Sequence, residues 1–212
     1  MPLTGSEIKK QVAAGNIIID PFDEAQVNPN SYNVRLGEEL GIYVGTIDVQ
    51  AFEQLFEQEG PLPRSILDCR KDNTLHYLKM PKAGALLYPG KLYLGATVEY
   101  TYTPKHVPVI DGRSSLARLG VKVHVTGGFG DIGFKGHWTL EIEVTEPVRI
   151  YPNMQFAQIR FHEPVGTIDM VYQGKYLGDV RPTASRIHKE ISDDGTEHNE
   201  PRAAGSGTPE DR

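Results

Sequence analysis

Short hydrophobic runs separated by turn-forming residues make up most of the chain. From Ile17 onward, the runs are rich in Val, Ile, Leu, Tyr and Thr, as in YNVRL, LGIYVGTI, LLYPGKLYLGATVEYTY, VPVIDG, HWTLEIEV and FAQIRFH. Such runs are typical of β-strands, and the 22 glycines and 15 prolines allow many turns between them. The pattern therefore predicts a mainly β fold, either a sandwich or a barrel.

A single short helix is predicted before these strands, over residues Leu3 to Ala14. Ile8 and Val12 recur at helical spacing and form an apolar face. Thr4 or Ser6 could cap the helix at its start, because a hydroxyl there can accept from a free N–H group of the first turn. We therefore expect one helix in front of the β domain.

Two parts of the chain depart from the strand pattern. Residues 50–75 are read either as a short helix or as an insertion before the next strand. Residues 188–212 hold seven acidic residues against three Lys or Arg and have little apolar surface to bury. We expect one folded domain over residues 1–187 and a disordered acidic tail from 188 to 212.

Charge and cysteine content restrict the possible functions. The net charge is -6 and most of it comes from the tail, so the domain has no general basic field for nucleic-acid binding. Cys69 is the single cysteine, which excludes an intrachain disulfide and a cysteine-based zinc site. No apolar run is long enough to span a membrane and the N-terminus lacks a signal core. We expect a cytoplasmic protein without a membrane or nucleic-acid partner.

The segment DGRSSLARLG, residues 111–120, has the composition of a phosphate-binding turn. Its first glycine lets the backbone approach a ligand, and the free N–H groups of a short helix would favour an anion. Ser114 and Ser115 could cap that helix. Arg118 would share a face with Ser114 and could bind phosphate oxygens together with Arg113. The alternative is an ordinary surface helix with solvated arginines.

A candidate acid lies in the strand WTLEIEV. By alternation, Thr139, Glu141 and Glu143 share one face of this strand. An acid that faces a closed pocket can transfer protons, which makes Glu141 a candidate catalytic residue. Glu143 could equally be the functional acid, and both could face solvent.

The hairpin before that strand carries further polar residues. Asp131 follows GGFG and is typical of a turn, although it could also accept a sugar hydroxyl or activate water. His124 and His137 lie on either side of the hairpin. Without acids at metal-ligand spacing they do not indicate a metal site, and His124 is expected in the core or at an interface.

Taken together, these segments resemble the dCTP deaminase family, which shares a trimeric β fold with the dUTPases. The resemblance covers about residues 1–186 and rests on NPNSYNVRLG (28–37), YPGKLYLGATVEY (88–100), DGRSSLARLG, HVTGGFGDIGFKGHWTLEI (124–142), YPNMQFAQIRFH (151–162) and GKYLGDVRPTASR (174–186). It implies a dUTPase-like distorted β-barrel or jelly roll with a short N-terminal helix. It also implies a homotrimer with active sites at the subunit interfaces.

The resemblance also implies roles for individual residues. Glu141 would be the catalytic proton carrier in the hydrolytic deamination of dCTP. The residues that would bind the nucleotide are Arg113, Ser114, Ser115, Leu116, Ala117, Arg118, Asp131, Thr139, Leu140, Glu141, Gln158, Tyr172 and Lys175. Mg²⁺ would lie on the triphosphate held by residues 113–118, without protein side chains as ligands. Zinc is not expected, because the zinc deaminases use H-x-E and P-C-x-x-C.

The family has one branch that releases dUTP and another that also cleaves dUTP to dUMP and pyrophosphate. Gly128 and Phe129 resemble the dUMP-forming branch, which reads Thr-Ala-Gly-aromatic where a group of the other reads Thr-Ala-His-Arg. We therefore expect a dUMP-forming dCTP deaminase. A deaminase that releases dUTP, a plain dUTPase and a non-catalytic nucleotide-binding regulator are the alternatives.

Two residues of the C-terminal segment depart from the family pattern. Leu177 and Asp179 stand where glutamines are common. An acid close to a triphosphate is unfavourable unless it points away or meets magnesium.

Overall fold

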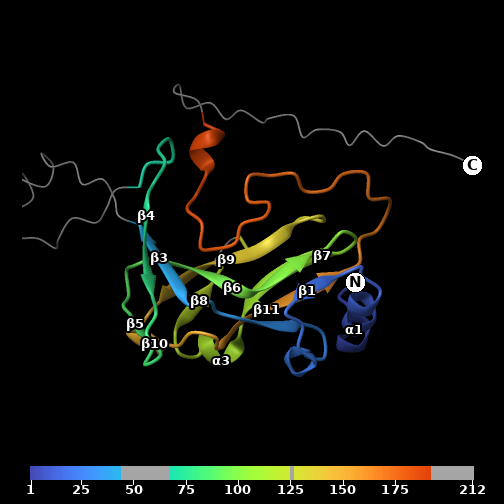
Figure 1. Ribbon diagram of the computed structural model, residues 1–212, viewed down its shortest axis with the longest axis horizontal. Helices are drawn as coiled ribbons and strands as arrows, with labels where there is room; N and C mark the ends of the chain where they lie inside the picture. The colour runs from blue at the N-terminus through green and yellow to red at the C-terminus, as the bar shows by residue number, and fades with distance from the viewer. Residues whose placement is uncertain (44–66, 125–126, 192–212) are drawn as a thin grey trace, which may run out of the picture.

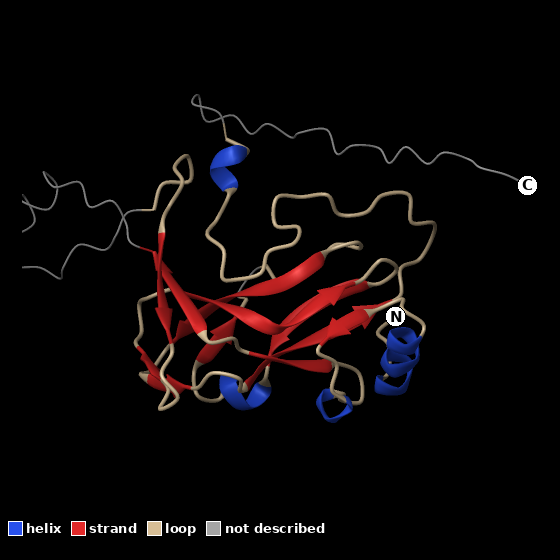
Figure 2. Ribbon diagram, viewed as in Figure 1, coloured by secondary structure: helices blue, strands red, loops and turns tan. Residues whose placement is uncertain are grey.

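The computed structural model describes residues 1–43, 67–124 and 127–191 (Figures 1 and 2). The elements are α1 (Gly5–Ala13), β1 (Ile18–Asp20), η1 (Glu24–Gln26), β2 (Tyr32–Arg35), β3 (Glu39–Tyr43), β4 (Leu75–Lys79), β5 (Ala85–Leu87), β6 (Tyr93–Tyr102), β7 (Val107–Gly112), α3 (Ser114–Ala117), β8 (Val121–Val123), β9 (Lys135–Val144), β10 (Val148–Ile150), β11 (Gln155–His162) and η2 (Ile187–Lys189). Most of the segment 50–75, whose structure the sequence left open, lies outside the described residues. None of the described helices is long and apolar enough to cross a membrane.

The predicted N-terminal helix is confirmed as α1. The side chain of Thr4 is the N-cap and accepts from the backbone N–H of Glu7 at 3.3 Å. Ile8 is completely buried against the β domain, which explains the apolar face of the helix. Gly15 follows with a φ of +71°, a conformation that costs glycine little and ends the helix.

Three antiparallel sheets form the body of the molecule. The largest has the order β4-β3-β6-β9-β8, with β1 also paired to β6; a second contains β2, β11 and β7, and β10 pairs with β5. The inward side chains of the sheets pack into one core that includes Tyr32, Leu140, Phe156 and Phe161. The sequence prediction of a mainly β fold with one short helix in front is therefore confirmed.

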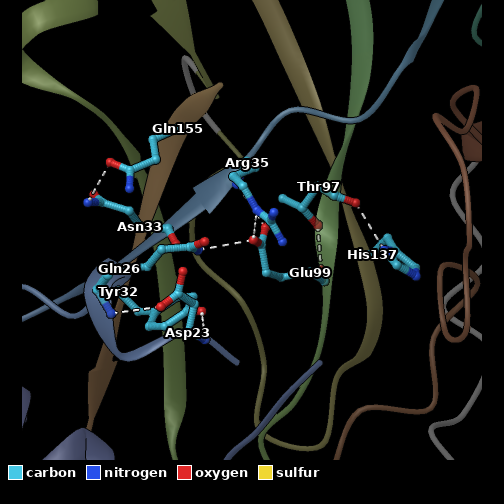
Figure 3. Close-up of polar contacts among 10 residues, drawn as sticks. Asp23, Gln26, Tyr32, Asn33, Arg35, Thr97, Glu99, His137 and Gln155 are labelled. Atoms are coloured by element: carbon cyan, nitrogen blue, oxygen red, sulfur yellow. Dashed lines mark hydrogen bonds and ion pairs between the residues drawn. The ribbon is translucent and has the colours of Figure 1, made fainter. Parts of the chain in front are cut away.

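A bulge interrupts the pairing of the two longest strands, β6 and β9. Ala96 pairs with Thr139 and Tyr100 pairs with His137, so β6 has extra residues at this point. The bulge turns Glu99 into the interior, where its side chain is fully buried. Its carboxylate accepts from Arg35 Nε at 2.7 Å and from Gln26 Nε2 at 3.0 Å (Figure 3). These partners offset the cost of burying a charge, which is large for an unpaired carboxylate.

The described chain after β11, residues 163–191, crosses over β9 and adds no strand to the sheets (Figure 1). Its backbone is tied to the beginning of β9, because Gly178 N–H donates to Lys135 O at 2.8 Å and His137 N–H donates to Asp179 O at 2.9 Å. The segment 172–186 thus lies against the edge of the main sheet. Residues 188–191 of the predicted tail are described and belong partly to η2, whereas residues 192–212 lie outside the described residues.

Candidate active site

A cavity of about 480 Å³ lies between β9, the hairpin that precedes it and the C-terminal segment. β9 contributes alternate side chains, because successive residues of a strand point to opposite faces. His137, Thr139 and Glu141 are half-buried and line the cavity. Leu140 is predicted to contact the base, but its side chain is completely buried in the core on the other face. The alternation expected for this strand is therefore confirmed, and it separates Glu141 from Leu140.

The structure also distinguishes the two acids of this strand. Glu141 lines the cavity, whereas the carboxylate of Glu143 lies 3.6 Å from Lys122 Nζ on β8. Glu143 does not line the cavity among the described residues. Of the two candidates that the sequence left open, Glu141 is the one that lines the cavity.

His124 holds the carboxylate of Glu141. The distance from its Nδ1 to Glu141 Oε2 is 2.6 Å, and an ionised carboxylate can only accept, so Nδ1–H donates. The backbone of His124 has a φ of +48°, a conformation that few residues other than glycine adopt and that is concentrated at functional sites. The short contact fixes the orientation of the carboxylate in the cavity. The sequence missed this role because His124 and Glu141 come together only through the pairing of β8 with β9.

The glycines of the hairpin allow it to pack tightly against β7. A Cβ at Gly128 would lie 2.4 Å from Ile110 O, and Ile110 N–H donates to Gly128 O at 2.8 Å. A Cβ at Gly130 would lie 2.4 Å from the ring of Trp138. Gly128 is therefore needed for the close approach of two backbones. Phe129, beside it, is 72% exposed and lies at the rim of the cavity.

Asp131 and Tyr172 line the same cavity, although they belong to different segments of the chain. Asp131 is exposed at the turn before β9, and its backbone oxygen accepts from the backbone N–H of Phe134. Tyr172 N–H donates to Ile132 O at 2.7 Å, which fixes the start of the C-terminal segment. Burial raises the pKa of the Tyr172 phenol above its ordinary value, so this hydroxyl stays protonated and can donate. Both predicted binding residues thus meet at the cavity that contains Glu141.

The acid at Asp179 is neutralised within the chain. Asp179 lines the cavity, and its carboxylate lies 2.9 Å from Arg186 Nη2. The guanidinium of Arg186, seven residues further along the chain, therefore offsets the negative charge that would repel a triphosphate. Lys175 is predicted to bind the nucleotide, but it forms a 2.5 Å ion pair with Glu190 and does not line the described cavity. The neighbouring Tyr176 lines it instead.

The predicted phosphate-binding turn forms the four-residue helix α3, away from this cavity. Ser114 and Ser115 are its first residues and not its caps, because the N-cap is Arg113, whose side chain makes no capping bond. Arg113 Nη1 donates to Gln155 O, and Arg118 Nη1 donates to Ser114 O at 2.9 Å. In Figure 1, α3 and the C-terminal segment lie on opposite sides of the sheets.

The other residues predicted around the triphosphate lie near α3. Leu116 is buried, Ala117 is exposed, and both belong to the helix. Gln158 on β11 donates to Gly112 O at 3.2 Å and accepts from Ser31 Oγ at 3.0 Å. One chain thus carries two separate groups of predicted site residues, one at α3 and one around Glu141. Among the described residues, no group of three or more His, Cys, Asp or Glu side chains could hold a metal ion.

Comparison with known proteins agrees with this architecture. A solved structure of 2'-deoxycytidine 5'-triphosphate deaminase from Agrobacterium tumefaciens superimposes with a TM-score of 0.54 at 20% sequence identity. The match covers 77% of this chain and 48% of that chain, so this protein spans about half its length. The fold is thus that of this deaminase, a mainly β fold as the resemblance implied.

The family follows from the sequence comparisons. The model of the dCTP deaminase-like family matches residues 2–164. A dUMP-forming dCTP deaminase of Clostridium beijerinckii is 44% identical over 191 residues, which cover 90% of this chain and 99% of that protein. One of Leptospira biflexa is 45% identical over 191 residues, covering 90% and 98%. This chain belongs to the dCTP deaminase-like family.

Proposed function

We propose that the protein hydrolyses the amino group of dCTP and then releases pyrophosphate, so that dUMP is the product. The observation that carries this proposal is the carboxylate of Glu141, held by His124 at 2.6 Å on the wall of a cavity large enough for a nucleoside. The dUMP-forming names of the two relatives support the choice of substrate and product.

Deamination requires water to add at C4 of the base and ammonia to leave. Glu141 accepts a proton from the attacking water as the C–O bond forms at C4, and it returns a proton to the amino group as the C–N bond breaks and ammonia leaves. His124 fixes the orientation of the carboxylate and can share its proton. Thr139, two residues before Glu141 on the same face of β9, lines the same cavity and would contact the base.

The product is tested by a time course with dCTP and Mg²⁺, followed by separation of the nucleotides by anion exchange. We expect dUMP and pyrophosphate to accumulate while dUTP stays at a trace. Release of dUTP in step with the loss of dCTP would indicate a deaminase of the other branch. Turnover of dUTP without turnover of dCTP would indicate a dUTPase, and binding without any turnover would indicate a regulator.

The complete site is assembled from more than one copy of the chain. The support is that no residue of α3 lines the described cavity that contains Glu141, and that α3 and the C-terminal segment lie on opposite sides of the sheets (Figure 1). If Arg118 of one copy lies over the cavity of another, the triphosphate and the base occupy one site at an interface. A homotrimer closes such head-to-tail contacts into a ring. Mg²⁺ belongs to the substrate in this arrangement, because it prefers phosphate oxygens and water as ligands.

Replacing Arg118 with alanine is expected to weaken binding of dCTP far more than binding of deoxycytidine. A charge-assisted hydrogen bond to phosphate is worth roughly 1.5–3 kcal/mol, which corresponds to a loss of about 10- to 100-fold. Isothermal titration with both ligands measures the difference. Arg149→Ala is the matched control, because Arg149 is exposed on β10. Equal losses for the two ligands would show that Arg118 does not contact the triphosphate.

A further inference from the structure

Acidic side chains dominate the charged groups of the cavity wall. Glu141, Asp131 and Asp179 line the cavity, and none of its described lining residues is a lysine or an arginine. A nucleoside triphosphate that enters brings several negative charges toward these acids. Asp131 is exposed to solvent, which screens its charge. The side chain of Asp179 is only 12% exposed, so its charge acts on the cavity with less screening.

The backbone of Asp179 is attached to the beginning of β9. His137 N–H donates to Asp179 O at 2.9 Å, and the neighbouring Gly178 N–H donates to Lys135 O at 2.8 Å. A Cβ at Gly136 would lie 3.1 Å from Asp179 O, so the two segments are in close contact. Asp179 therefore stays at the cavity for as long as the C-terminal segment is attached to the sheet.

The guanidinium of Arg186 is held beside this carboxylate by several contacts. Nη2 lies 2.9 Å from Asp179 Oδ1, and Nη1 donates to the backbone oxygen of Lys175. The backbone N–H of Arg186 donates to the hydroxyl of Tyr176 at 3.0 Å, and the guanidinium carbon lies 5.5 Å from the centre of that ring. An exposed ion pair gains little because two free side chains must be ordered, whereas both partners are already fixed here.

We propose that Arg186 is a positioning residue that acts as the permanent counter-ion of Asp179 and thereby sets the affinity of the cavity for an anionic nucleotide. This inference rests on the proposed function and gives Arg186 no contact with the nucleotide. With the pair intact, the cavity wall at Asp179 is close to neutral. Without the guanidinium, which is always charged, the carboxylate would repel a triphosphate in a site where the effective dielectric constant is lower than in water.

The variant Arg186→Gln tests this role by removing the charge while it keeps a hydrogen-bond donor. We expect the Kd of dCTP to rise by about 10-fold, because the carboxylate of Asp179 is then unpaired. Binding of deoxycytidine, which carries no phosphate, should stay within about two-fold of wild type. Isothermal titration calorimetry measures both ligands. The loss for dCTP relative to wild type should shrink as salt is added, because salt screens the repulsion.

A second substitution distinguishes a counter-ion from a ligand of the nucleotide. The double variant Asp179→Asn/Arg186→Gln removes both charges, so its Kd for dCTP should return to within about three-fold of wild type. Asp179→Asn alone leaves the guanidinium uncompensated and should strengthen binding of dCTP relative to deoxycytidine. Arg186→Lys keeps the positive charge and should bind dCTP more tightly than Arg186→Gln.

Arg181→Gln is the matched control on the same segment. Arg181 forms an exposed ion pair with Glu39 at 3.2 Å, and it does not line the described cavity. The ratio of the Kd values for dCTP and deoxycytidine should therefore be that of wild type.

The outcomes separate this inference from the proposed function. Equal losses for dCTP and deoxycytidine in Arg186→Gln would overturn it, because the role of Arg186 would then be structural. A double variant that binds dCTP as weakly as Arg186→Gln would overturn it too, because Arg186 would then contact the nucleotide itself. If Arg186→Gln does not fold, weaker binding of dCTP relative to deoxycytidine in Asp179→Asn overturns it. A wild-type protein that binds dCTP without deaminating it contradicts the proposed function alone, and one that does not bind dCTP contradicts both.

Discussion

Glu141→Gln is expected to abolish deamination while dCTP still binds within a few-fold of wild type. Glutamine has the shape of glutamate and its amide oxygen can still accept from His124 Nδ1, which lies 2.6 Å from the carboxylate. The amide cannot accept a proton from water or return it to the amine. The loss in turnover should therefore be at least ~10²-fold. Single-turnover measurements of dCTP loss, with titration calorimetry for binding, measure the two quantities separately.

The strand contains its own control for this experiment. Glu143→Gln changes the same residue type two positions along β9, where the carboxylate faces Lys122 outside the described cavity. Its turnover should equal that of wild type. A Glu141→Gln enzyme with wild-type turnover, or a Glu143→Gln enzyme with the same defect as Glu141→Gln, would exclude Glu141 as the proton carrier.

Mixing two impaired variants is expected to restore activity at dCTP concentrations too low to saturate the Arg118→Ala variant. Arg118→Ala lacks the arginine that caps α3 and Glu141→Gln lacks the acid of the cavity, and Arg118 does not line that cavity among the described residues. If the site lies between copies, a mixed assembly contains interfaces where an intact Arg118 meets an intact Glu141. Co-expression with two different affinity tags, followed by sequential purification, isolates the mixed assemblies. Their activity should rise far above that of either variant alone.

The same experiment can contradict the shared site. Mixed assemblies that stay as impaired as their parents at the same low dCTP concentration would show that Arg118 and Glu141 act within one chain. Light scattering of the wild-type protein provides an independent measurement, because a homotrimer has three times the chain mass of 23.5 kDa. An active protein with the mass of a single chain would exclude the trimer.

Local sequence patterns predicted the features that depend on neighbouring residues. The spacing of Ile8 and Val12 and the cap at Thr4 belong to one helix, and the structure has that helix. The alternation along β9 placed Thr139 and Glu141 on one face, away from Leu140. The alternation of a strand depends only on neighbouring residues. For this reason the sequence alone was enough to predict the mainly β fold and the candidate acid Glu141.

Contacts between distant segments could not be read in the same way. The pairing of His124 with Glu141 requires a left-handed backbone between β8 and the hairpin. The ion pair of Asp179 with Arg186 depends on how the C-terminal segment folds over β9. Gln158 lies beside Gly112 because β11 pairs with β7, a neighbour far away in sequence.

The contact between Gly128 and β7 limits which residues the hairpin accepts at this position. Any other residue at Gly128 brings a Cβ to within 2.4 Å of Ile110 O, a backbone atom that cannot rotate away. A single substitution of Gly128 would therefore displace the hairpin before it could alter the chemistry. Engineering a different product at this position requires a compensating change in the main chain around Ile110, and not a side-chain replacement alone.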